Sequence, residues 1–398
     1  MKNLTLLLVA LLFSLSSFAL DFGLDRFSEP EVAAKFEGKN LAVLTHAAAR
    51  SKTGEHLIDL LFSSFKLKKI FAPEHGLRTA EDDYVGDGTD EATGLPVISL
   101  YKRGTRAPQA SDLAGIDAIV VDLQDVGVRY YTYFSTIAEV MKAAASQNIE
   151  VILLDRPNLL GGDIVEGKLL DPSLAGGFTS YHTVPTRHGM TLGELALMIN
   201  HEKNMKVKLT VIPASGWNRE NLLSTMDRPW IAPSPALVDI KQVGLYAIWG
   251  ALENFNVAVG RGQTNEAAFS VLGAPWIKEA ETQKLAQNLN ALGFKNISFK
   301  PHSWKVTRAL HVGKVAQGVK VTWNGEEVRT DEFTYKVGQV LIKMFPDRLS
   351  VANMSPAGYG SVSMVNAMKK QIPWSEFGAL IDKEIREFKE RRIPFLLY

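Results

Sequence analysis

The sequence contains no cysteine in its 398 residues. Disulfide bonds, iron–sulfur clusters, thiolate-ligated zinc and thiol nucleophiles all require this residue, so the chain has none of them. A lipoprotein anchor on an N-terminal cysteine is excluded for the same reason. The chemistry of this protein must therefore come from side chains that carry oxygen and nitrogen.

An excess of charge of one sign is also lacking. Lysine and arginine total 44 against 43 aspartates and glutamates, which leaves a formal charge of +1 at pH 7. Proteins that bind nucleic acids usually carry a strong positive field, so we predict no nucleic-acid partner. An anionic ligand must then be held by individual arginines.

Long hydrophobic runs are absent beyond the N-terminal segment. There, Lys2 precedes an apolar run from Leu4 to Leu15, and Ser17-Phe18-Ala19 supplies the small residues that signal peptidase requires. The run is shorter than the roughly 20 residues of a membrane-spanning helix. We therefore predict that residues 1–19 are a signal peptide, that the mature chain has no membrane span, and that the protein is exported to a periplasm or secreted.

Motifs for nucleotide and zinc chemistry are missing too. The first predicted strand is not followed by G-x-G-x-x-G, and the chain has no Walker loop and no G-x-S-x-G elbow. His201-Glu202 lacks the second histidine of the zinc motif H-E-x-x-H. Because ATP and NAD are not ordinary substrates outside the cytoplasm, we predict that the protein works without a cofactor and without a metal ion.

What the sequence does have is a regular alternation of strand and helix patterns from residue 40 to about residue 215. This alternation predicts a mostly parallel sheet covered by helices on both faces, in a Rossmann-like α/β domain that we assign to residues 20–240. The predicted strands are 41–45, 69–72, 97–101, 118–123, 151–154 and 208–212, and the predicted helices are 56–64, 132–146 and 192–202.

The pattern changes after a proline-rich connector at Asp227–Asp239. Beyond it, strand and helix patterns are mixed, which predicts a smaller α+β domain over residues 241–398 that closes a cleft against the first. A chain of 398 residues is long enough for two domains. The predicted helices here are 278–292, 331–344 and 375–391, and the predicted strands are 297–300 and 319–322.

Three polar segments follow predicted strands of the first domain: Phe71–Gly76, Asp122–Tyr133 and Asp155–Asn158. In open parallel sheets the ligand binds outside the carboxyl ends of the strands, so we expect these segments to share one rim. Glu74 beside His75, between a proline and a glycine, has the pattern of a positioned general acid. An ordinary exposed turn is an equally good interpretation of these residues alone.

The other polar residues of this rim are open to two interpretations. Arg129 is suited to grip a substrate carboxylate while nearby tyrosines pack on a sugar, because a guanidinium offers a planar pair of donors. Alternatively, Asp122, Asp125 and Arg129 form an ion-pair cluster that only fixes the strand end. Asp155 and Arg156 allow the same two interpretations.

Glu166 lies in a glycine-rich loop and is a candidate second carboxylate, since glycoside hydrolysis usually needs two. His188 precedes the capping box that opens the helix 192–202, from where it either reaches the cleft or bonds a backbone carbonyl. Arg261, in the loop Gly260–Thr264, would reach the ligand from the second domain, although a surface turn is the default for such a segment.

Taken together, these segments resemble one known family, the exo-lytic β-N-acetylmuramidases of the NamZ type. The resemblance covers essentially the whole mature chain. It implies a Rossmann-like N-terminal domain, a smaller C-terminal domain, a cleft between them, and release of N-acetylmuramic acid from the non-reducing ends of peptidoglycan fragments. The matching motifs are Phe71–Gly76, Ser99–Tyr101, Asp122–Tyr133, Leu154–Asn158, Val165–Gly167, Arg187–Ala196, Pro233–Pro235, Gly260–Gly262, Gly273–Trp276 and Leu396–Tyr398.

Carried over position by position, the resemblance implies that Glu74 is the catalytic acid and Glu166 its candidate partner. It also implies a sugar pocket lined by His75, Gln124, Asp125, Arg129, Tyr131, Asp155, Arg156 and His188. We expect either Arg129 or Arg261 to pair with the lactyl carboxylate of muramic acid.

The chain departs from the family pattern at a few positions. Ala258 and Val259 stand where the family usually has serine and glutamate, and Ala236 stands where it usually has asparagine. The segment Thr45-His46-Ala47 also differs from the usual threonine, asparagine and proline. These changes bear on the substrate subclass more than on Glu74.

Two other functions remain as alternatives. In a metal-dependent hydrolase, Asp122, Asp125, Glu74 and His75 would hold a divalent cation through oxygen and imidazole ligands. In a non-catalytic periplasmic binder of wall fragments, the cleft would hold the glycan without cleaving it.

Overall fold

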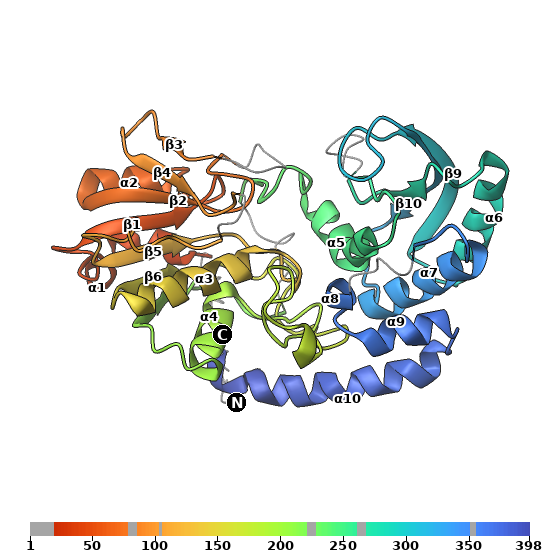
Figure 1. The fold of residues 1–398 in the computed structure, drawn as a ribbon. Coiled ribbons are helices and arrows are strands. Elements are labelled where there is room, and N and C mark those ends of the chain that lie inside the picture. Colours follow the sequence, from red (N-terminus) through yellow and green to blue (C-terminus); the bar gives the residue numbers. More distant parts are fainter. Residues whose placement is uncertain (1–19, 79–85, 103–105, 221–227, 261–267, 351–355) are drawn as a thin grey trace, which may run out of the picture.

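The computed structural model describes residues 20–78, 86–102, 106–220, 228–260, 268–350 and 356–398. Within them the chain forms two sheets with their helices, side by side along the molecule (Figure 1). Strand segments between residues 40 and 212 build the larger sheet, and those between 271 and 323 build the smaller one. The predicted α/β fold with a second, smaller domain is confirmed.

The larger sheet has seven strands in the order β3-β4-β2-β1-β5-β6-β7. All neighbouring pairs are parallel except β3 with β4 at one edge. Six of the strands match the sequence prediction, and β3 is an addition. Their bounds are β1 (Asn40–Thr45), β2 (Lys66–Ala72), β3 (Gly88–Thr89), β4 (Pro96–Ser99), β5 (Ala118–Asp122), β6 (Glu150–Leu154) and β7 (Leu209–Ile212).

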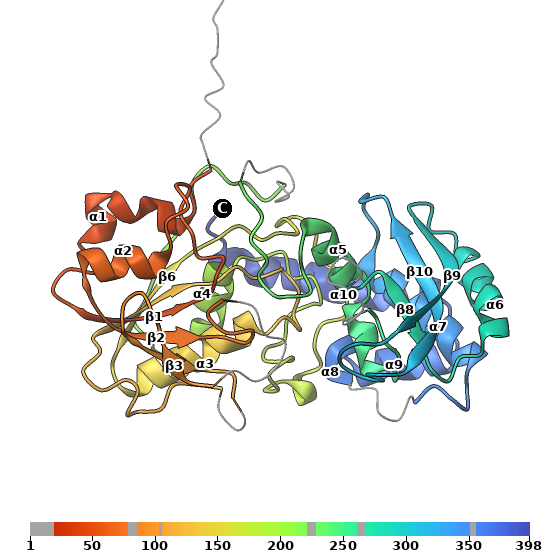
Figure 2. The ribbon, with the colours of Figure 1, turned by 90° about the horizontal axis from the view of Figure 1, so that it is seen from above.

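Both faces of the central strands are buried, because alternate side chains pack into two separate cores. Leu41 and Val43 of β1 belong to the core under α1 (Pro30–Ala33) and α2 (Leu57–Ser64). Ala42 and Leu44 belong to the core under α3 (Tyr133–Ser146) and α4 (Leu192–Glu202). Figure 2 shows α1 and α2 on one side of this sheet and α3 on the other.

The smaller sheet is antiparallel, in the order β8-β10-β9, and helices pack beside it. The elements β8, α5 and α9 were not expected from the sequence pattern. The elements are α5 (Ile240–Trp249), η4 (Gly250–Asn254), β8 (Val271–Ala274), α6 (Glu279–Asn290), β9 (Ile297–Lys305), β10 (Val315–Trp323), α7 (Thr330–Met344), α8 (Pro356–Tyr359), α9 (Val362–Lys369) and α10 (Trp374–Arg392).

The end of the chain returns to the first domain. Helix α10 runs beneath both sheets, and the C-terminus lies near α4 (Figure 1). The Tyr398 hydroxyl donates a hydrogen bond to Asp155 Oδ2 at 2.8 Å, and Leu397 N donates to Glu194 Oε1 at 2.9 Å. The C-terminal residues thus hold the two domains together, in addition to the connector. No helix among the residues described is long and apolar enough to cross a membrane.

Candidate active site

A cavity of about 160 Å³ lies where the two domains meet. The first domain contributes polar side chains from the loop after β2 and from the segment that enters α3. The connector contributes Ser234 and Ala236, and the second domain contributes residues from α5, η4 and the segment before β8. The side chains that matter for the chemistry are Glu74, His75, Tyr130, Tyr131 and Thr132 on one side, and Ser234, Tyr246, Glu253 and Phe269 on the other.

The loop after β2 places Glu74 at this cavity. Strand β2 ends at Ala72, and the chain then turns through His75 and Gly76, whose φ angles of 71° and 72° are left-handed. Glycine adopts this region freely, and histidine is one of the few other residues enriched there. The turn brings the Glu74 carboxylate to Thr132, whose hydroxyl donates a hydrogen bond to Oε2. The meeting of these two strand-end segments, expected from the sequence, is confirmed.

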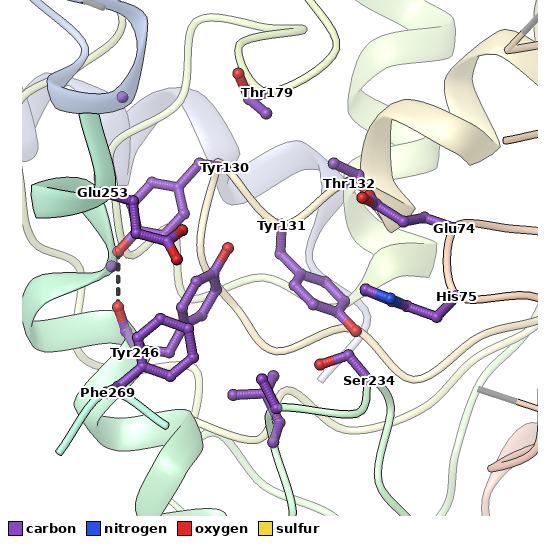
Figure 3. Close-up of a pocket in the computed structure, with 14 residues that line it drawn as sticks. Glu74, His75, Tyr130, Tyr131, Thr132, Thr179, Ser234, Tyr246, Glu253 and Phe269 are labelled. Atoms are coloured by element: carbon purple, nitrogen blue, oxygen red, sulfur yellow. Dashed lines mark hydrogen bonds between the residues drawn. The ribbon is translucent and has the colours of Figure 1, made fainter. Parts of the chain in front are cut away.

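Tyrosines form the wall between the two sides of the cavity. The hydroxyls of Tyr131 and Tyr133 both donate to the carbonyl of Pro233, at 3.0 and 2.7 Å, which fixes the connector to the first domain. Tyr130 donates to the carbonyl of Tyr246 at 2.9 Å, and this bond joins the same segment to α5 (Figure 3). Planar aromatic rings held in this way offer apolar faces to a ligand.

Arg129 does not line the cavity, contrary to the expectation that it grips a carboxylate there. Its guanidinium is buried and donates to three main-chain carbonyls, those of Lys168 at 2.8 Å, Val184 at 3.0 Å and Gly358 at 3.2 Å. Burial lowers the pKa of Arg129 to about 10. The structure therefore gives this residue a structural role, in which it ties two loops of the first domain to α8.

Arg156 is likewise engaged elsewhere. It forms a buried ion pair with Asp122, with Nη2 at 3.0 Å from Oδ2, and its guanidinium lies 4.8 Å from the ring centre of Phe22. The sequence interpretation of an ion pair at this strand end was correct for Asp122. The partner, however, is Arg156 rather than Arg129.

Asp155 fixes the start of α4 rather than facing the cavity. It is fully buried and accepts hydrogen bonds from the hydroxyls of Thr191 at 2.7 Å and Tyr398 at 2.8 Å. Burial raises the pKa of Asp155 to about 7. This carboxyl group therefore holds together the end of β6, the helix α4 and the C-terminus.

Three further residues predicted for the sugar pocket lie in the protein interior. The Gln124 amide donates to the carbonyl of Pro157 at 3.1 Å. Asp125 Oδ1 accepts from Gly127 N at 2.7 Å, and burial raises its pKa to about 7. His188 is buried, and its pKa falls to about 3 because the charged form is poorly solvated there. All three are absent from the cavity lining.

Glu166 does not line the cavity, and the structure therefore does not bring it together with Glu74 as predicted. Glu166 Oε2 accepts from the backbone N–H of Thr330 at 3.0 Å and from its hydroxyl at 2.8 Å. Thr330 is the first residue of α7, so this carboxylate satisfies a free donor at the helix start. Burial raises the pKa of Glu166.

Of the predicted site residues, the structure thus brings Glu74, His75 and Tyr131 together at one cavity. Arg261 lies outside the described residues. The cavity residues that were not expected from the sequence come mainly from the connector and the second domain: Ser234, Tyr246, Glu253 and Phe269. For Ser234 the motif Pro233–Pro235 was a usable signal, whereas Glu253 follows a helix that the pattern did not predict.

The four ligands of the metal-dependent alternative are not assembled. Glu74 and His75 line the cavity, but Asp122 is held by Arg156, and Asp125 is held by backbone groups. Within the part of the chain that the structure describes, no three histidine, aspartate or glutamate side chains are grouped to hold a metal ion.

Two glutamates and several tyrosine rings around one cavity fit the class of glycoside hydrolases, whose reaction usually uses a pair of carboxyl groups. The particular family follows from comparison with known proteins. The N-terminal domain model of the exo-β-N-acetylmuramidase NamZ family matches residues 41–241, and its C-terminal domain model matches residues 244–398. The chain belongs to this family.

Individual relatives agree with this assignment. The peptidoglycan β-N-acetylmuramidase NamZ of Bacillus subtilis (strain 168) is 36% identical over 296 residues, which are 73% of this chain and 70% of the relative. Two crystal structures of DUF1343 family proteins from Bacteroides fragilis NCTC 9343 are also similar. Their TM-scores are 0.83 and 0.73 at 29% and 26% identity, and each match covers 95% of this chain and 99% of the other.

Proposed function

We propose that this protein is an exo-acting β-N-acetylmuramidase that releases N-acetylmuramic acid from the non-reducing ends of peptidoglycan fragments. Family membership across both domains supports the reaction class. The observation that carries the proposal is the half-buried Glu74, held at the cavity between the domains by the Thr132 hydroxyl. A carboxyl group in this position is what protonation of a glycosidic oxygen requires.

Glu74 acts in this proposal as the proton donor. Thr132 donates to Oε2, and among the described residues no donor is bonded to Oε1, so the second oxygen can serve the substrate. The tyrosine rings of the cavity wall provide a surface for the sugar, and His75 lines the same cavity. The Arg129 guanidinium donates its hydrogen bonds to main-chain carbonyls, so we do not assign the lactyl carboxylate to it. Recognition of this carboxylate by Arg261 stays a prediction.

We also propose that the protein is exported. The basic residue, apolar run and small residues at the start of the chain support a signal peptide over residues 1–19. Peptidoglycan lies outside the cytoplasm, so an exported enzyme would meet its substrate there.

The test uses the purified mature protein with a chromogenic β-N-acetylmuraminide and the matching β-N-acetylglucosaminide. We expect chromophore release from the muraminide alone, with and without a chelator. Glu74→Gln should abolish release from a natural disaccharide and leave the thermal unfolding midpoint unchanged, while Glu91→Gln, an exposed glutamate of the same domain, should behave as wild type. Near-normal turnover of the natural disaccharide by Glu74→Gln would disprove the role of Glu74. No product from either kind of substrate with the wild-type protein would favour a non-catalytic binder.

A further inference from the structure

A second carboxylate lines the cavity that holds Glu74. Glu253 is part of the short helix η4 (Gly250–Asn254), so it comes from the second domain, whereas Glu74 comes from the first. Figure 3 shows Glu74 and Glu253 on opposite sides of the cavity, with Tyr131 between them in this view. Two carboxyl groups on opposite sides of one cavity are the arrangement that most glycoside hydrolases use.

Other acidic residues near the strand ends do not meet this requirement. Glu166 is bonded to Thr330, Asp122 is paired with Arg156, and Asp155 is buried under the C-terminus. Among the described residues that line the cavity, Glu74 and Glu253 are the acidic ones.

The short helix that carries Glu253 is firmly held. Its neighbours Leu252 and Phe255 are 0% and 2% exposed, and the Phe255 ring packs against Tyr359 at 5.7 Å between ring centres. Burial of these apolar side chains on one side of the turn directs Glu253 to the other, where it lies near Tyr130. The charge of Glu253 adds to burial in raising the pKa of Tyr130, which agrees with this proximity.

We propose that Glu253 is the second catalytic carboxylate of the hydrolysis, a role that rests on the proposed function. Glu74 gives its proton to the glycosidic oxygen, and the bond from that oxygen to the anomeric carbon breaks with its electron pair going to the leaving sugar. Ionised Glu253 stabilises the positive charge that develops at the anomeric carbon. Water then bonds to this carbon through its oxygen and releases one proton, which restores the protonated state of Glu74.

Glu253→Gln tests this role because it removes the charge and keeps the size of the side chain. We expect kcat to fall about 100-fold or more, the loss typical for removing one group that stabilises transition-state charge, with little change in KM. The matched control is Glu390→Gln, at an exposed position of α10, which should retain wild-type rates. Thermal unfolding checks that each variant is folded, and Glu253→Asp, which retains the charge, should keep more activity than Glu253→Gln.

The choice of leaving group separates the two carboxylates. A nitrophenolate departs without protonation, so Glu74→Gln should lose much less activity on a nitrophenyl muraminide than on a natural disaccharide. Glu253→Gln should lose a similar factor on both, because charge develops at the anomeric carbon in either case. A folded Glu253→Gln variant with kcat within threefold of wild type, or a loss confined to KM, would overturn the inference. An inactive wild-type protein would instead overturn the proposed function.

Discussion

Substitution of Arg129 distinguishes the structural role that its hydrogen bonds indicate from the carboxylate-binding role expected from the sequence. Substitution by methionine keeps much of the side chain's length but removes its hydrogen bonds to the carbonyls of Lys168, Val184 and Gly358. Each buried acceptor left without a partner costs about 1–3 kcal/mol. The Val184 carbonyl also accepts from Leu170 N at 3.3 Å, so two acceptors lose their partner. We therefore expect Arg129→Met to lose at least about 2 kcal/mol of unfolding free energy, twice the lower bound.

The assay combines urea unfolding with steady-state kinetics on the folded fraction. If Arg129 is structural, the folded variant should discriminate the muraminide from the glucosaminide as the wild type does. Lys208→Met, which removes an exposed cation of the same domain that is paired with Glu150, is the control and should cost no more than about 1 kcal/mol. An Arg129→Met protein as stable as wild type, but unable to select the muraminide, would refute this reasoning and restore the role as a carboxylate ligand.

Two further predictions concern buried carboxyl groups away from the cavity. Glu166→Gln should lower the unfolding free energy by about 1 kcal/mol through a weaker bond to Thr330, yet keep more than half of the wild-type kcat; a loss comparable to that of Glu74→Gln would contradict our placement of Glu166. Burial raises the pKa of Asp155 in the folded state to about 7, above the ordinary value of 3.8. Between these two pH values the folded state holds a proton that the unfolded state has released. The free energy of unfolding therefore falls as the pH rises through this range. Relative to wild type, Asp155→Asn should therefore gain about 1.4 kcal/mol per pH unit from pH 5 to pH 7 in unfolding experiments, and a constant difference would contradict the raised pKa.

The larger sheet was predictable because its signal is local. Strands such as β5 and β6 are short, apolar and bounded by turn residues, and a parallel sheet buried on both faces requires that pattern. The position of Glu74 was predictable for a related reason, since the carboxyl ends of parallel strands share one edge. Both inferences depend only on residues close in sequence and on general topology.

Helix α5 shows where local signals fail. Its sequence contains Gly244 and several β-branched or aromatic residues, which have modest or poor helix propensity. One local and one tertiary feature compensate. Asp239 accepts hydrogen bonds from Lys241 N and Gln242 N at the helix start, and the Trp323 ring packs where a side chain at Gly244 would lie, 2.3 Å from the position of a Cβ atom. The cap is a usable local signal, whereas the contact with Trp323 cannot be inferred from the helix and its immediate neighbours.

The roles of buried polar residues failed for a different reason. Arg129, Asp155 and Glu166 all have the residue type and local position of site residues. Their side-chain hydrogen bonds, however, go to residues 36 to 243 positions away, as in the bond from Tyr398 to Asp155. A parallel sheet brings many polar groups to one edge, and most of them must be satisfied internally before any remain for a ligand. The sequence can therefore predict which edge of the sheet carries the site. Which polar residues at that edge are free to bind a ligand can be read only from the three-dimensional structure.

The departures from the family pattern can be placed by the same reasoning. Ala236 lines the cavity beside Ser234, so the loss of the usual asparagine removes a hydrogen-bonding group from the surface that faces the ligand. Ala258 and Val259 are buried, at 8% and 3% exposure, and they pack with apolar neighbours, so their effect is on the support of the second domain's side. Glu74 and Glu253, the carboxylates of our two proposals, line the same cavity as Ala236. The change at Ala236 thus alters the wall of that cavity, whereas the changes at Ala258 and Val259 act through apolar packing.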